Sequence, residues 1–117
     1  MKTGIELIAE ERQRQIEVEG WTPEHDDELV NGELANMAAT YALPPFFREA
    51  MIDNIASECT INGICPTWPY YDIGIEWFKP TPDDRIRELA KAGALIAAEI
   101  DRLNRESVNY FFENSLA

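Results

Sequence analysis

The chain has 117 residues, a length that suits one domain with one modest core. Its net charge is −12, from 22 acidic against 10 basic residues, and such an excess repels nucleic-acid phosphates and anionic lipid. Hydrophobic residues make up 45% of the chain, which excludes a disordered protein. We therefore expect one globular domain, residues 1–117, with no nucleic-acid and no membrane partner.

The sequence also indicates the cellular compartment of the protein and the redox state of its cysteines. The first residues lead directly into an amphipathic pattern, with no apolar run of signal-peptide or membrane-spanning length, so we expect a cytoplasmic protein. Cys59 and Cys65 are the only cysteines and there is a single histidine, too few ligands for a structural zinc site. Reduced thiols and no bound metal are the expectation.

The N-terminal segment predicts a helix that ends at Glu19. Thr3 and Glu6 have the spacing of a capping box. Gly20 suits the left-handed position after a helix, and Trp21 would then pack back onto the last turn. The apolar side chains of this helix recur on one face: Ile5, Ile8 and Ile16.

The middle of the chain predicts shorter elements. Pro23–Val30 is one or two helical turns or an ordered loop, and Asn31 is expected to cap a helix over Gly32–Ala42. Pro44 and Pro45 end that helix and begin another, which carries Phe47, Met51 and Ile55. Residues 57–80 hold prolines, glycines and aromatic side chains without a period of two, which predicts a loop anchored by its aromatics. These aromatics are Trp68, Tyr70, Tyr71, Trp77 and Phe78.

A long C-terminal helix over Thr81–Arg105 is the expected centre of the fold. Thr81 is its predicted N-cap and Pro82 its first helical residue. Gly93 leaves a narrow point where another backbone can approach. Its apolar stripe, expected to bury the other segments, is Ile86, Leu89, Ala90, Gly93, Ile96, Ala97, Ile100 and Leu103. Together these patterns predict an all-α bundle of about four helices.

The last residues, 106–117, form a C-terminal tail that is unusually apolar over Asn109–Phe112. Such a tail either docks on the body of the domain or meets a second copy. We therefore expect a homodimer, formed through this tail or at Gly93.

Several blocks of this sequence are distinctive in their order and spacing: Glu11–Gln15, Glu19–Asp27, Gly32–Ala35, Trp68-Pro69, Trp77–Pro80, Lys91–Ile96 and Asp101–Leu103. Together they resemble a widespread group of small phage and prophage proteins. The resemblance covers most of residues 4–105 and implies a phage protein that acts inside a bacterial host. A weaker resemblance is to ryanodine-receptor-type repeat domains, which likewise have a helix that ends in Gly-Trp with Asp-Asp shortly after it. That resemblance implies a site for nucleotide-derived signals.

The densest polar cluster is His25, Asp26 and Asp27, directly after Trp21. Two carboxylates and an imidazole suit acid–base chemistry or a cation. The structural alternative is that Asp26 or Asp27 pairs with Arg12, which lies on an apolar helix face.

A second group of candidates surrounds the start of the long helix. Arg87 and Lys91 follow the predicted N-terminus and Lys79 precedes it, as a phosphate site requires, while Trp77 suits stacking on a base. The structural alternative is a solvated helix face and aromatics that plug the core. Our first hypothesis joins both groups into one site for a phosphorylated nucleotide-type ligand, such as a host immune signal, held without catalysis. Its residues are Arg12, Trp21, His25, Asp26, Asp27, Trp77, Lys79, Arg87 and Lys91.

Two further hypotheses stay open. The first is magnesium-dependent nucleotide pyrophosphate hydrolysis of the MazG type, which needs acids spaced three or four apart on two helices. The candidate acids are Glu24, Asp27, Glu28 and Glu33, but the long helix has no matching pair. The second is an acidic inhibitor that binds a basic host protein. No Walker-type glycine loop or nucleophile elbow is present.

Overall fold

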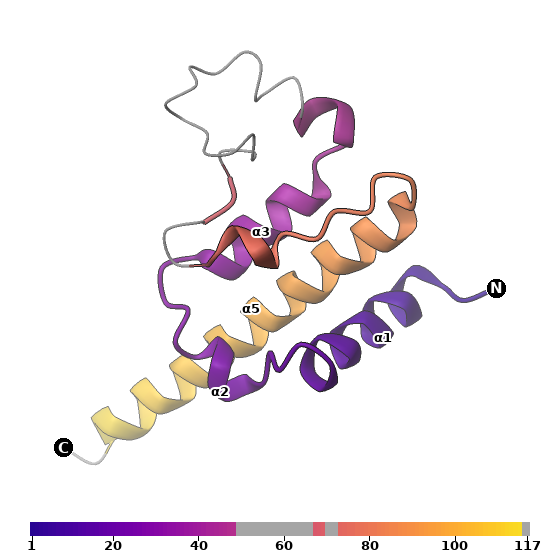
Figure 1. Cartoon of the computed structure of the whole chain (residues 1–117). Helices are drawn as coiled ribbons and strands as arrows, with labels where there is room; N and C mark the ends of the chain where they lie inside the picture. Colours follow the sequence, from indigo (N-terminus) through magenta and orange to yellow (C-terminus); the bar gives the residue numbers. More distant parts are fainter. Residues whose placement is uncertain (49–66, 70–72, 116–117) are drawn as a thin grey trace, which may run out of the picture.

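The computed structural model describes residues 1–48, 67–69 and 73–115 (Figure 1). Over these residues the protein is helical and has no strand, which confirms the predicted all-α fold with a long C-terminal helix. No helix in these ranges is both long enough and apolar enough to cross a membrane. The elements are α1 (Gly4–Glu17), α2 (Pro23–Asp26), α3 (Glu33–Ala42), the 3₁₀ turn η2 (Ile75–Trp77) and α5 (Arg85–Ser115).

Helix α1 begins and ends as its sequence predicts, to within two residues. The Thr3 hydroxyl accepts from the Glu6 N–H at 3.2 Å, and the Glu6 carboxylate accepts from the Thr3 N–H at 3.1 Å, so the capping box is confirmed. Gly20 has a φ of 76°, and the Trp21 N–H donates to the carbonyl of Gln15 at 3.0 Å. This turn directs Trp21 into the interior, where it is 4% exposed.

Helix α3 starts differently from the prediction. Gly32, with a φ of 79°, is its N-cap residue and supplies no side-chain cap. Asn31, the predicted cap, donates its own N–H to the carboxylate of Glu33 at 2.6 Å instead. After α3, residues 45–48 are helical, as Pro44 and Pro45 predicted. The other expectations on this stretch and on the cysteines lie outside the described residues: Met51, Ile55, Cys59, Cys65, Tyr70 and Tyr71.

Helix α5 begins at Arg85 and not at Thr81. The side chain of Asp84 accepts from the Arg87 N–H at 3.1 Å, which makes Asp84 the residue that caps the helix. Thr81 lies before it and donates its N–H to the carboxylate of Glu88 at 3.0 Å. Residues 106–115, predicted as a separate tail, continue α5 and project beyond the rest of the molecule (Figure 1).

Helices α1 and α3 lie along different sides of α5, and α2 crosses it near the base of the projecting end (Figure 1). The core forms mainly between α3 and the alanine-rich side of α5, because small side chains let two helices approach closely. The buried side chains in this cluster are Trp21, Leu29, Leu34, Met37, Ala38, Tyr41, Trp68, Ile73, Ala92, Leu95 and Ala98.

The predicted apolar stripe of α5 does not build this core. Its large side chains are exposed: Ile86 67%, Leu89 47%, Ile96 49%, Ile100 54% and Leu103 46%. The opposite side of the helix is buried because it offers alanines together with charged groups that find partners inside the fold. The expectation that this stripe packs against the earlier segments is therefore wrong for its large side chains, although the stripe's Ala90 is buried at 8% exposure.

The narrow point at Gly93 is used within the chain. A Cβ atom at Gly93 would lie 2.5 Å from the Cδ1 atom of Ile8, so α1 rests on α5 at this glycine. Ile8 is half-buried there, whereas Ile5, one turn earlier, is 82% exposed.

A buried carboxylate joins α5 to the end of α3. Glu88 is 0% exposed and receives hydrogen bonds from Arg48 at 2.8 Å and from Arg85 at 3.1 Å. Both arginines also donate to carbonyls at the C-terminal end of α3: Arg48 to Thr40 and Leu43, Arg85 to Tyr41, Ala42 and Leu43. These carbonyls have no partner within their own helix, so Glu88 positions the two cations that satisfy them.

We expect Glu88→Gln to lower the free energy of unfolding by roughly 3 kcal/mol at neutral pH, because it leaves Arg48 buried without its counter-charge. Burial alone would raise the pKa of Glu88, but the hydrogen bonds from Arg48 and Arg85 hold it below the usual 4.5. A carboxylate with a lowered pKa in the folded state adds stability above its unfolded pKa and loses it as the pH falls through the folded pKa.

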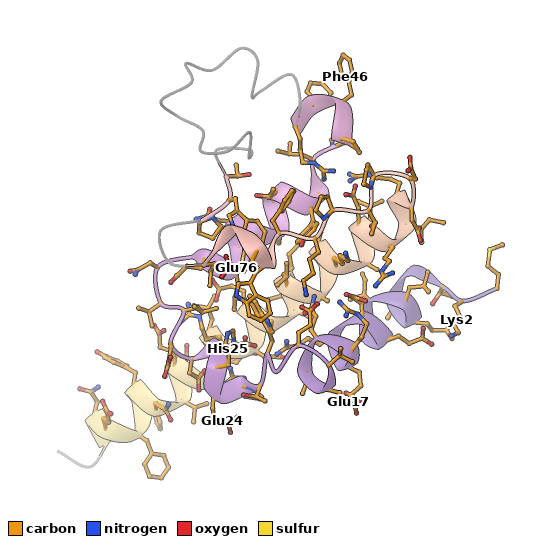
Figure 2. All side chains as sticks on the ribbon, in the orientation of Figure 1. Lys2, Glu17, Glu24, His25, Phe46 and Glu76 are labelled. Carbon is orange, nitrogen blue, oxygen red and sulfur yellow. The ribbon has the colours of Figure 1, made fainter. Side chains whose placement is uncertain are left out.

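Urea unfolding at a series of pH values below 4.5 measures this contribution. The wild type should lose stability across that range, and Glu88→Gln should lose less. The exposed Glu24 provides the control, Glu24→Gln (Figure 2). If the wild type and Glu88→Gln lose equal stability as the pH falls, the ionised Glu88 carboxylate does not stabilise the fold as described.

Candidate functional site

A shallow groove runs between the end of α1, residues 77–81 and the first turns of α5. Its volume is about 470 Å³, within the range of small-molecule sites. We call it the basic groove, and its lining residues are Arg14, Val18, Glu19, Trp77, Lys79, Pro80, Thr81, Arg87 and Lys91.

Positive charge is concentrated here. Arg14, Lys79, Arg87 and Lys91 are four of the 10 lysine and arginine residues in a chain of net charge −12. Glu19 is the only acid in the lining, and it lies 3.4 Å from Arg14 and 3.3 Å from Lys79. The groove is thus a local positive region on an acidic protein, where anions are favoured.

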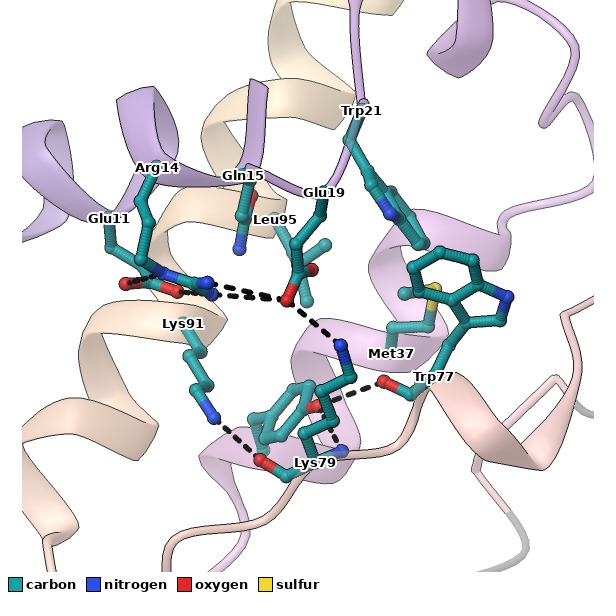
Figure 3. A pocket seen from close by; sticks show the side chains of 11 residues that line it. Glu11, Arg14, Gln15, Glu19, Trp21, Met37, Trp77, Lys79, Lys91 and Leu95 are labelled. Atoms are coloured by element: carbon teal, nitrogen blue, oxygen red, sulfur yellow. Dashed lines mark hydrogen bonds and ion pairs between the residues drawn. The ribbon is translucent and has the colours of Figure 1, made fainter. Parts of the chain in front are cut away.

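Arg14 is a fixed charge in this groove. Its guanidinium donates to both carboxylate oxygens of Glu11, at 2.6 and 3.0 Å, and this hydrogen bonding raises the pKa of Arg14 above its usual value. Figure 3 shows the guanidinium held between Glu11 and Glu19. The fork geometry of arginine suits oxyanions, and here the carboxylates of Glu11 and Glu19 already occupy it.

Lys91 and Arg87 carry the charge that the fold does not neutralise. The Nζ atom of Lys91 donates to the carbonyl of Lys79 at 2.5 Å and lies 5.5 Å from the centre of the Tyr41 ring. Burial lowers the pKa of Lys91, and the positive charge of Arg87 lowers it further. Neither side chain is ion-paired within the part of the chain that the structure describes. A bound anion would relieve this repulsion.

A small cavity of about 20 Å³, close to the size of one water, lies beside the groove and shares five of its lining residues: Arg14, Glu19, Trp77, Lys79 and Lys91 (Figure 3). We call this side the inner end of the groove. Trp21 and Gln15 line the cavity, and within the described ranges the Nε1 atom of Trp21 and the Oε1 atom of Gln15 have no hydrogen-bond partner. Buried polar atoms are rarely left unsatisfied, so a water or a polar atom of a ligand is expected here.

Aromatic rings border the same end. Trp77 meets Trp21 edge to face, with ring centres 5.7 Å apart, and is 37% exposed on its outer side. The Nζ atom of Lys79 lies 5.3 Å from the centre of the Trp77 ring. An indole that is partly open to solvent and next to a cation is suited to stack on a heteroaromatic base.

The structure divides the sequence-predicted site residues into two places. Lys79, Arg87, Lys91 and Trp77 line the basic groove, and Trp21 lies at its inner end. The others lie around α2, outside the groove lining: Arg12, His25, Asp26 and Asp27.

The charges around α2 are satisfied within the chain. Arg12 pairs with the fully buried Asp26 at 2.6 Å and donates to the carbonyl of Trp21 at 3.2 Å. His25 lies 3.0 Å from the same carboxylate, and Asp27 pairs with Arg105 at 2.8 Å. The Arg12–Asp26 pair is the structural alternative that the sequence offered, and it fastens α1 to α2.

Sequence reasoning missed the contribution of α1 to the groove. Glu11 and Gln15 are 7% and 5% exposed, although both are polar. With Arg14 and Glu19 they recur at helical spacing, and this polar stripe faces the interior of the fold. Its spacing is visible in the sequence, whereas its burial is not.

The acids of the pyrophosphatase hypothesis do not gather. Glu33 accepts from the Asn31 N–H, Asp27 pairs with Arg105, and Glu24 and Glu28 are exposed. Within residues 1–48, 67–69 and 73–115 no group of three or more His, Cys, Asp or Glu side chains is arranged to hold a metal ion.

Comparisons of the chain with protein-family models, with curated proteins and with solved structures give no match. The resemblances to phage proteins and to the ryanodine-receptor-type repeat therefore stay expectations drawn from the sequence blocks alone.

We expect Arg12→Met to lower the free energy of unfolding by about 3–5 kcal/mol, because Asp26 is then buried without its counter-charge. Replacing both partners, as Arg12→Met with Asp26→Leu, should recover part of that loss. Urea unfolding measures both, and Lys2→Met is the control, since the Lys2–Glu10 pair is exposed and lies at the far end of α1 (Figure 2). A loss for Arg12→Met no larger than for Lys2→Met contradicts the structural role.

Proposed function

We propose that this protein binds a phosphorylated, nucleotide-type ligand in the basic groove and holds it without chemical conversion. The observation that carries the proposal is the gathering of Arg14, Lys79, Arg87 and Lys91 around one groove of a chain of net charge −12. Two of these cations, Arg87 and Lys91, lack a carboxylate partner among the described residues.

The phosphate end of the ligand is assigned to Arg87 and Lys91. They are four residues apart on α5, so their side chains emerge from the same face of the helix. Like charges at this spacing repel each other, and a phosphate between them replaces the repulsion with two charge-assisted hydrogen bonds. Arg14, which is paired with Glu11 and Glu19, borders the site on the side of α1.

The base end is assigned to Trp77 and Trp21. Trp77, which is 37% exposed, would supply the stacking surface once the Lys79 ammonium over its ring moves aside to the phosphate, and the unpartnered Nε1 of Trp21 offers one hydrogen-bond donor. Stacking tolerates different bases, so the selectivity of the site would come from the phosphate arrangement and from this donor.

The setting is part of the proposal. The sequence blocks that resemble phage proteins support a role inside the bacterial host cytoplasm, where capture of a nucleotide signal would interfere with host defence. An acidic inhibitor of a basic host protein is the alternative that the net charge of −12 favours. This alternative is selected if the protein binds no nucleotide but binds a host protein, with an affinity that falls steeply as salt is added.

The test is calorimetry of the purified protein against inorganic phosphate and against mono-, di- and cyclic nucleotides. At least one nucleotide should bind, and Lys91→Met and Arg87→Met should each weaken it by roughly 10- to 100-fold, the effect of one charge-assisted hydrogen bond. Lys2→Met, remote from the groove, should bind like the wild type. Absence of heat with every compound overturns the proposal.

The pH dependence follows from Lys91. Because its pKa lies below the usual 10.5, nucleotide affinity should fall as alkaline pH removes this proton, and earlier than for a solvated lysine. Lys91→Met should abolish this alkaline decline. If pyrophosphate is released in the presence of magnesium during the same titrations, the protein hydrolyses the nucleotide and the proposal of binding without conversion is wrong.

A further inference from the structure

The outward side of α5 carries a row of large apolar side chains that nothing in the described chain covers. Ile86, Leu89, Ile96, Ile100 and Leu103 are between 46% and 67% exposed on one helix. Single exposed apolar residues are ordinary, but a continuous row of them along a rigid helix marks an interaction surface. We call Ile86, Leu89, Gly93, Ile96, Ile100 and Leu103 the outer seam.

The spacing of the outer seam identifies its kind of partner. Its residues follow one another at steps of three, four, three, four and three, which is a heptad pattern with an average of about 3.5 residues. A row with that period stays aligned with a second helix, whereas a stripe that faces a globular core follows about 3.6 residues. The outer seam is therefore shaped for a long partner helix.

We propose that the partner is the α5 helix of a second copy, packed antiparallel on the outer seam. In this arrangement Ile86 lies opposite Leu103 of the other copy, and Leu89 lies opposite Ile100. Each pair occurs twice about a two-fold axis, so the seam is complementary to itself, as a closed dimer requires.

The centre of the seam is covered within each chain. Gly93 has no side chain, and Ile8 of α1 lies over it, with Cδ1 2.5 Å from the place where a Cβ would be. Ile96 of the second copy would therefore meet Ile8 and not the backbone of Gly93, so the pair of α1 helices forms part of the interface. Ile5, which is 82% exposed, lies one turn from Ile8 and extends the apolar surface.

The helix dipoles favour the antiparallel direction. Parallel packing brings the like ends of two helices together, whereas antiparallel packing opposes the two dipoles. The charged side chains add nothing to this preference, because the part of α5 that holds Glu106 also holds Arg102 and Arg105. The negative charge of each copy opposes association over longer distances, so added salt should tighten the dimer.

Light scattering and sedimentation over a range of concentrations test the surface. The wild type should be a dimer, and Ile96→Glu with Ile100→Glu should weaken association by about 100-fold or more, because a buried seam does not accept unpaired charge. Val108→Glu is the matched control, since Val108 is 61% exposed on the same helix but off the seam. Far-UV circular dichroism should be unchanged, because all these side chains are exposed in the single chain.

Cysteine cross-linking tests the direction, in a background with Cys59 and Cys65 replaced by serine. Mixed Leu89→Cys and Ile100→Cys proteins should form the disulfide, and Leu89→Cys alone should not. The proposal that the outer seam is the dimer interface is overturned if the wild type is a monomer at all concentrations. It is also overturned if the variant with Ile96→Glu and Ile100→Glu dimerises with the affinity of the wild type. Cross-linking of Leu89→Cys with itself overturns the antiparallel arrangement.

Discussion

The carboxylate of Glu88 determines which side of α5 turns inward. It is fully buried, and it holds Arg48 and Arg85, whose guanidinium groups also satisfy the carbonyls at the end of α3. Separating this group would leave two buried charges, Glu88 and Arg48, without partners, a cost of several kcal/mol. Once Glu88 points inward, the alanines on the same side meet α3, and the large side chains of the outer seam point outward.

The same choice places the charges of the candidate site. With Glu88 inside, Lys91 one turn further lies beneath residues 77–81, and Arg87 faces the rim of the basic groove. The polar stripe of α1 then closes the groove from the other side, where Arg14 is fixed between Glu11 and Glu19. One helix thus serves the core, the groove and the outer seam with three different sides.

The sequence predicts the local structure at the two ends of α1, because its causes are local. The Thr3 capping box and the Gly20 turn depend on residues a few positions apart, and both are present. The starts of α3 and α5 were predicted at Asn31 and Thr81, which instead donate their N–H groups to Glu33 and Glu88. The inward side of α5 is different, since it depends on Arg48, which is 40 positions from Glu88. Hydrophobic periodicity depends only on the side chains of one helix and carries no information about Arg48. It therefore predicted that the side with the large apolar residues is buried, whereas the side with Glu88 is.

The residues of the candidate site were likewise predicted only in part from the sequence. Trp77, Lys79 and Lys91 were found because their residue types and their position at a helix start suggest phosphate and base binding. Arg14 and Glu19 were not, because a polar stripe on a surface helix normally faces solvent.

The sidedness of α5 is tested most directly by a pair of substitutions two residues apart. Ala98 is 0% exposed in the core and Ile96 is 49% exposed on the outer seam. Urea unfolding of Ala98→Gln and Ile96→Gln is measured at concentrations where light scattering shows monomers. Ala98→Gln should cost roughly 2–4 kcal/mol and Ile96→Gln about 0.5 kcal/mol or less. A larger loss for Ile96→Gln than for Ala98→Gln would contradict this account of α5.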